Sequence, residues 1–144
     1  MMMTYEEMVA ADVRDYIGIN ANIRWDYDED EVVVDYNGDT LSVDDFQERL
    51  DSDLYNDDSV TGSASGSYTC NRWAAQEYVL DDIETLQEAA EAGCISAEDI
   101  GSFILRGDWE ALDVICRCYV LWRAAGQAIE EELEIAADEG KIPA

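Results

Sequence analysis

The residues of this sequence that could do chemistry are carboxylates, which are densest between positions 24 and 40. The stretch RWDYDEDEVVVDYNGDT places seven acids around three consecutive valines, and Arg24 is the only base within it. Like charges repel, so such a concentration does not serve stability. Three uses fit it: a metal-binding loop, a solvated face, or a surface for a partner that normally binds something negative.

A calcium loop fails at its deciding positions. An EF-hand loop that starts at Asp26 requires glycine at its sixth position and glutamate at its twelfth, where this sequence has Glu31 and Asn37. A loop that starts at Asp35 fails at the same two positions. We therefore expect no dedicated metal site and no cofactor, with weak, non-specific calcium binding as the remaining alternative.

Motifs for catalysis are missing from the sequence. A glycosidase needs two carboxyl groups in different environments, but 35 acids supply such pairs by chance. No G-x-S-x-G elbow, P-loop or dinucleotide-binding glycine pattern occurs. The run GSASGS at residues 62–67 lacks the Gly-Lys-Ser/Thr ending of a phosphate loop, and histidine is absent altogether. We therefore expect a protein that is not an enzyme.

The four cysteines are Cys70, Cys94, Cys116 and Cys118, and no two of them form a C-x-x-C pair. Two residues apart on a helix, Cys116 and Cys118 point about 200° apart, so they cannot share one ligand face. We interpret all four as reduced, mostly buried thiols of a cytosolic protein. The N-terminus has no signal-peptide pattern, and charges interrupt the apolar stretch 109–129, which predicts a core helix rather than a membrane span.

Apolar periodicity predicts an α+β fold, mainly helical, in a single domain spanning residues 1–144. It has about five helices and a small three-stranded antiparallel meander near residues 21–43. Caps and spacing place the helices near residues 4–17, 42–53, 71–92 and 96–107, and from 108 towards the C-terminus.

The meander is predicted by alternation and by one turn signal. Ile23, Trp25 and Tyr27 alternate with polar residues, as do Val32 and the apolar residues after it. Asn-Gly at 37–38 is the strongest short hairpin signal, typical of a type I′ turn. We expect a sheet with one apolar face, which fixes the strands, and one acidic face.

Apolar spacing also predicts which helix faces are buried. In the helix at 71–92 we expect Trp73, Ile83 and Leu86 to point inward. The last helix has two adjoining stripes, so it should be central, and burial of this wide face against a second copy of the chain, as a homodimer, is an alternative. The stripes contain Leu112, Ile115, Tyr119, Trp122, Ile129 and Leu133, and Ala111, Val114, Cys118, Leu121, Ala125 and Ala128.

The charge balance limits the classes of partner. The chain has 35 acids and 8 bases, for a net charge of −27. We therefore expect no direct binding to nucleic acid or membrane, and a partner with a basic surface. Scarce lysine also fits the alternative of a saline-adapted protein whose carboxylates hold water.

Acids along strands and helices recur at intervals that resemble the phosphates of a nucleic-acid strand. Alternate strand residues lie about 6.7 Å apart on one face, and helix positions three or four apart have Cβ atoms about 5–6 Å apart. A rigid body with such rows can occupy a basic DNA groove. The predicted partner-binding residues are Asp26, Asp28, Glu29, Asp30, Glu31, Asp35, Asp39, Asp44, Asp45, Glu48, Asp51, Asp53, Asp57 and Asp58.

A resemblance adds to this interpretation. The segment DDSVTGSASGSYTCNRWAAQEYV at 57–79 resembles a motif of small acidic proteins encoded by prophages and integrative elements of gut bacteria. The S-V-T-G-x-x-S-G-S-Y-T core, Asn71, Trp73 and Glu77 carry the likeness, which covers about a sixth of the chain. The sequence departs at Cys70, where the family has an aromatic residue. The resemblance implies a mobile-element accessory role, a class that includes anti-CRISPR proteins and anti-restriction DNA mimics, and it brings no catalytic residues.

Two functions remain open at this point. The first is an anti-defence protein in the cytoplasm of a bacterial host, an anti-CRISPR protein that presents an acidic DNA-mimic surface to the DNA-binding cleft of a type II RNA-guided nuclease. The alternative is a non-enzymatic adaptor or regulator of mobile-element proteins, whose acidity serves only solubility. In that case the working surface is the uncharged loop from Gly62 to Tyr68.

Overall fold

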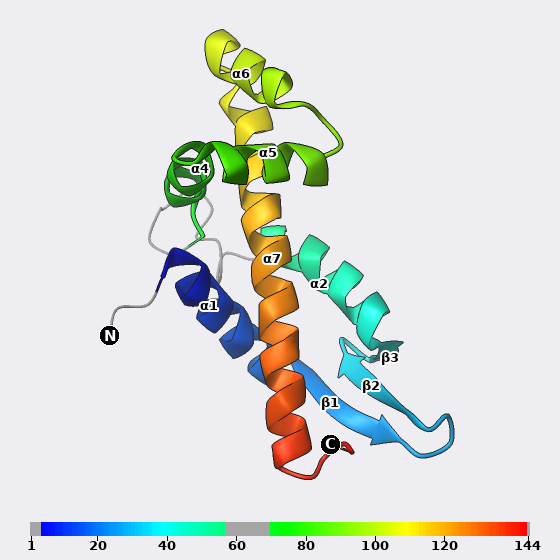
Figure 1. Cartoon of the computed structure of the whole chain (residues 1–144). Coiled ribbons are helices and arrows are strands. Elements are labelled where there is room, and N and C mark those ends of the chain that lie inside the picture. The colour runs from blue at the N-terminus through cyan, green and yellow to red at the C-terminus, as the bar shows by residue number, and fades with distance from the viewer. Residues whose placement is uncertain (1–3, 57–69, 144) are drawn as a thin grey trace.

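The computed structural model describes residues 4–56 and 70–143, and it confirms a mainly helical α+β fold with a three-stranded antiparallel sheet (Figure 1). The described residues form six helices, one more than predicted. In chain order the elements are α1 (Tyr5–Asn20), β1 (Ala21–Asp26), β2 (Glu31–Tyr36), β3 (Asp39–Ser42), α2 (Val43–Asn56), α4 (Arg72–Leu80), α5 (Ile83–Ala92), α6 (Ala97–Arg106) and α7 (Trp109–Asp138).

Helix α7 organises the molecule, as its two apolar stripes predict. Its 30 residues rise about 45 Å, and it packs against α1, α2, α4, α5, α6 and β1. Figure 1 shows α1 on one side of α7, and α2 with β2 and β3 on the other. Leu112, Ala125 and Ala128 of α7 are fully buried in the core between these layers.

Helix α1 starts where the sequence predicts and ends later. The Thr4 hydroxyl accepts a hydrogen bond from the backbone N–H of Glu7 at 3.1 Å, which caps the first turn. The predicted end at residue 17 is wrong, because the helix continues through Gly18 to Asn20 before Ala21 enters β1 with extended backbone angles. A glycine inside a helix costs only about 1 kcal/mol, so it need not end one.

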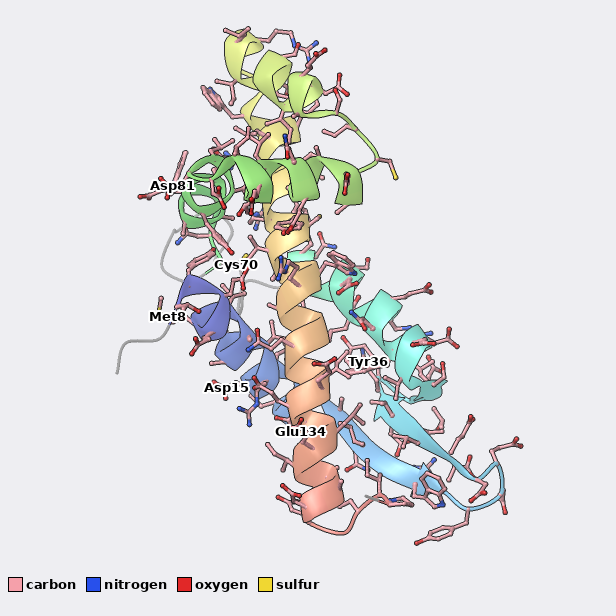
Figure 2. The ribbon with its side chains drawn as sticks, in the orientation of Figure 1. Met8, Asp15, Tyr36, Cys70, Asp81 and Glu134 are labelled. Carbon is pink, nitrogen blue, oxygen red and sulfur yellow. The ribbon has the colours of Figure 1, made fainter. Side chains whose placement is uncertain are left out.

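The sheet has the predicted order, β1-β2-β3, with Ile23 opposite Val34 and Val34 opposite Leu41. The Asn37–Gly38 turn has positive φ angles of 52° and 86°, as a type I′ turn requires. Tyr36 points toward α2 (Figure 2), where its ring meets that of Phe46 edge to face at 5.2 Å. The apolar face of the sheet is therefore anchored in the core.

The prediction of one helix over residues 71–92 is wrong, because α4 ends at Leu80 and α5 begins at Ile83. Between them Asp82 is extended, and its carboxylate accepts hydrogen bonds from the Glu84 N–H at 3.4 Å and the Thr85 hydroxyl at 3.2 Å. A new N-cap interrupts the helix there. The break also changes which side chains of the two helices are buried. Trp73 and Ile83, both expected inward, are 65% and 64% exposed.

The remaining predicted caps are confirmed. Ser42 caps α2 by accepting a hydrogen bond from the N–H of Asp45 at 3.1 Å, although α2 continues to Asn56 rather than ending near residue 53. Ser96 begins α6 with a full capping box, and Gly107 ends it in the left-handed conformation. The carboxylate of Asp108 then caps α7.

The charges that interrupt the stretch 109–129 include a buried ion pair. Arg117 donates two hydrogen bonds to Asp113, at 2.9 and 2.8 Å, and the two residues are only 6% and 2% exposed. Within the described residues, no helix is long and apolar enough to cross a membrane. The cysteines are all free thiols, with Cys70 and Cys116 buried; Cys94 and Cys118 are exposed, contrary to the expectation of mostly buried thiols.

Candidate acidic interaction surface

The densest acids lie in the turn between β1 and β2, at residues 27–30, rather than along a strand face. Asp26 closes this turn: its carboxylate accepts hydrogen bonds from the N–H groups of Asp28 and Glu29 at 3.0 and 3.3 Å, and its carbonyl accepts one from Asp30 at 2.8 Å. Because β1 ends at Asp26, the next residue, Tyr27, does not continue the apolar face and is 87% exposed. The carboxylates that follow project from a hydrogen-bonded turn.

Seven of the predicted partner-binding acids are exposed, and no hydrogen bond or ion pair engages their side chains within residues 4–56 and 70–143. They form two groups, one in and beside the β1–β2 turn and one in the first turns of α2. Both groups lie on the sheet side of α7 (Figure 1). We call them the free acids, and they are Asp28, Glu29, Asp30 and Glu31, and Asp44, Asp45 and Glu48.

Two other predicted acids, Asp35 and Asp39, pair with bases of the same chain. Asp35 accepts hydrogen bonds from Arg24 at 2.7 and 3.3 Å and from the Thr40 hydroxyl at 2.9 Å, and chiefly the bond with Arg24 lowers its pKa. Asp39 pairs with Arg49 at 2.6 Å across the β3–α2 junction. Both carboxylates therefore form contacts between elements of the fold. The acidic face of the sheet has fewer acids available to a partner than its acid content suggests.

Asp53 and Asp51 lie on the inner side of α2. Asp53 accepts a hydrogen bond from the Tyr36 hydroxyl at 2.6 Å, which ties α2 to β2. The Oδ1 atom of Asp51 is buried and has no hydrogen-bond partner among the described residues. Burial first, and the charge of Glu48 second, raise the pKa of Asp51 to about 7. Neither carboxylate is one of the free acids.

Almost all basic residues pair with acids of the same chain. All eight lie in the described residues, and seven of them contact acids, mostly in another element. The exception, Arg106, lies 5.6 Å from the centre of the Phe103 ring. The pairs are Arg14 with Glu131 and Glu132, Arg24 with Asp35, Arg49 with Asp39, Arg72 and Arg117 with Asp113, Arg123 with Glu6 and Glu88, and Lys141 with Glu139.

This distribution leaves the free acids without a neutralising base. Carboxylates of this kind accept short, charge-assisted hydrogen bonds from arginine and lysine, and arginine can bind them through two parallel bonds. The chemistry available here is therefore recognition of cationic side chains on a partner. Sequence patterns pointed to the region but did not separate the free acids from those with internal partners, because the pairing depends on tertiary contacts.

Metal binding has no geometric support in the part of the chain that the structure describes. No three histidine, cysteine, aspartate or glutamate side chains converge there as metal ligands do. Asp57, Asp58 and the loop from Gly62 to Tyr68 lie outside the described residues, so the adaptor alternative remains a prediction.

The structure also shows a site that the sequence patterns missed. Val114, Cys118 and Trp122 of α7, all expected inward, are exposed, and they line a groove between α7 and α2. The signal was present in the neighbouring residues, because Asp113 and Arg117 occupy the buried side of the same helix turns.

In comparisons with known proteins, no family model, no curated protein and no solved structure matches this chain.

Proposed function

We propose that the protein is a non-enzymatic inhibitor from a phage or mobile element, which presents the free acids to the DNA-binding cleft of a host defence nuclease. The specific candidate is a type II RNA-guided nuclease, which makes the protein an anti-CRISPR protein of the DNA-mimic class. Its place of action is then the cytoplasm of the bacterial host. The motif at 57–79, which resembles proteins of mobile elements, supports this assignment.

One observation carries the proposal: the free acids are concentrated at the β1–β2 turn and the start of α2, while the bases contact acids elsewhere. A DNA mimic has to keep negative charge unneutralised and in fixed positions. The hydrogen bonds of Asp26 fix the turn, and Val34 and Tyr36, fully buried, hold the hairpin that carries it. Ser42 fixes the first turn of α2.

The expected mechanism is competition for arginine and lysine residues. RNA-guided nucleases hold nucleic acid in positively charged channels and read the short flanking motif with arginine side chains. Carboxylates placed in such a channel replace phosphates as hydrogen-bond acceptors. With a net charge of −27, association with a basic cleft should be fast and should weaken as salt rises.

A charge-reversal set tests this mechanism. The turn set changes Asp28, Glu29, Asp30 and Glu31 to lysine; Asp35 is left intact, because its reversal would break the pair with Arg24. We expect the turn set to restore target-DNA binding by the nuclease, measured by a gel-shift titration with purified nuclease, guide RNA and inhibitor at several salt concentrations. Wild-type inhibitor should block DNA binding at low salt and lose potency at high salt.

The matched control alters net charge equally at dispersed positions. It changes Asp15, Glu77, Glu134 and Asp138 to lysine; all four are exposed, and no hydrogen bond or ion pair engages their side chains in the described residues. The control set should keep most of the inhibition, because only distant charges differ. Inhibition that survives both the turn set and high salt contradicts the DNA-mimic mechanism.

A further inference from the structure

A groove runs along one face of α7 and is separate from the β1–β2 turn. Its main part has a volume of about 830 Å³ and lies between α2, α5 and α7. The floor is apolar: Val114 and Trp122 are 45% and 49% exposed there, and Cys118 lies between them on the same helix. Large apolar side chains left open in a concave surface are typical of an interaction site.

A second hollow of about 520 Å³ continues the groove towards Gly126 and shares Trp122 with the first. Gly126 and Gln47 line this end of the hollow. The span from Val114 to Gly126 is about 18 Å along the helix axis. That length fits about three turns of a helix lying in the groove.

Acidic side chains form the walls of this groove. Glu48 and Asp51 of α2 line one part, and Glu88 and Glu91 of α5 line the other. Arg123 is the one base among the described lining residues, and it already donates to Glu88 at 3.0 Å. The carboxyl group of Asp51 belongs to this wall, and its Oδ1 atom has no hydrogen-bond partner among the described residues.

We infer that this groove binds an amphipathic helical segment of a partner protein, with apolar side chains against Trp122 and Val114 and lysine or arginine side chains at Glu48 and Asp51. Charge complementarity selects this occupant. A second copy of the chain, with a net charge of −27, would bring acids against acidic walls, which like-charge repulsion opposes. A basic amphipathic helix matches both the floor and the walls.

This inference does not depend on nuclease inhibition. It gives Glu48, which is also one of the free acids, and Asp51 a role in a second site with different requirements. The turn acids need only a cationic partner, whereas the groove needs apolar and cationic side chains on one segment. The two sites can therefore be tested by separate variants.

The test uses a fluorescein-labelled peptide of about 18 residues, built from leucine and lysine with leucines at helix spacing. A scrambled peptide of the same composition has the same charge but no apolar face. Fluorescence anisotropy at 0.15 M and 0.5 M NaCl should show at least about tenfold tighter binding of the amphipathic peptide to the wild-type protein. Equal affinity of the two peptides would mean that charge alone drives binding, which would overturn the inference.

Variants then locate the site. Trp122→Ala should weaken amphipathic-peptide binding at least about tenfold, and Val114→Ser should weaken it in the same direction with less effect on folding. The matched control is Trp73→Ala, since Trp73 is 65% exposed on α4 and lines no part of the groove. Loss of binding in the Trp73 variant, or none in the two groove variants, would place the peptide elsewhere and refute the assignment.

The cysteines give a footprint without mutation. Cys118 and Cys94 are both exposed thiols, and only Cys118 lines the groove. Bound peptide should slow N-ethylmaleimide labelling of Cys118 by at least about threefold and leave Cys94 unchanged, as measured by peptide mass spectrometry. Unchanged labelling of Cys118 under saturating peptide would contradict the inference. So would concentration-dependent self-association of the protein that Trp122→Ala abolishes, because the occupant would then be a second copy.

Discussion

Replacing Asp51 by asparagine should stabilise the protein above neutral pH. The carboxylate lies on the inner side of α2 with one oxygen buried and unpartnered, and burial together with the charge of Glu48 raises its pKa to about 7. An unfolded chain ionises aspartate near pH 3.9. Between these values the folded state holds a proton that the unfolded state has lost, so stability falls as the pH rises from about 4 to about 7.

The size of the effect follows from the difference between the two pKa values. Three pKa units correspond to about 4 kcal/mol if the whole shift were expressed in stability. Because the Asp51 side chain is only partly buried, solvent screening reduces this to roughly 1–2 kcal/mol. Asparagine has the same shape and no charge, so Asp51→Asn should recover that amount at pH 8 and almost none at pH 4.

Thermal unfolding followed by circular dichroism, at pH values from 4 to 8, measures this difference. For a chain of this length we expect the midpoint of Asp51→Asn to exceed that of wild type by roughly 3–8 °C at pH 8. Asp28→Asn is the control, since it removes the same charge from an exposed turn position and so reports only the general relief of repulsion. If both variants shift the midpoint equally at every pH, the reasoning about burial is refuted.

Three further predictions concern the core, the hairpin and the net charge. Asp113→Ala should lower the free energy of unfolding, measured in urea, by about 3–5 kcal/mol, because it leaves the buried Arg117 guanidinium without its charge partner. The double variant Asp113→Leu with Arg117→Met should recover most of that loss. Gly38→Ala should cost about 1 kcal/mol in the same assay, because φ at this position is 86°, and a neutral result would show that the turn relaxes. Raising NaCl from 0.1 M to 1 M, where the screening length falls from about 10 Å to about 3 Å, should raise the melting temperature; a fall would mean that ion pairs outweigh repulsion.

Local signals predicted most of the fold correctly. The Asn-Gly pair at 37–38, the capping hydroxyls of Thr4 and Ser96, and the apolar repeat of α7 each act over a few residues, so their outcome depends little on the rest of the chain. The break between α4 and α5 was also local, because Asp82 is a good N-cap residue. It was missed because the apolar spacing continues across it.

The features that the sequence could not show depend on contacts between segments far apart in the chain. Arg14 pairs with Glu131 and Glu132, more than a hundred positions away, and no pattern within either segment indicates the partner. Trp122 was expected inward because it lies in an apolar stripe of α7. The spacing of apolar residues does not show how much of a helix the neighbouring elements cover. Helices α2 and α5 both contact α7 but leave the groove between them, so this part of the apolar surface of α7 remains open.

The internal pairing of the bases bears on what the acidity is for. If carboxylates served only to hold water, as in a saline-adapted protein, the amount of charge would matter and its position would not. The turn set and the dispersed set of lysine substitutions change the net charge equally, but only the first alters acids next to the hairpin that Val34 and Tyr36 anchor. Equal losses of inhibition in the two sets would therefore support bulk charge, whereas a loss confined to the turn set would show that the fold fixes negative charge where a partner reads it.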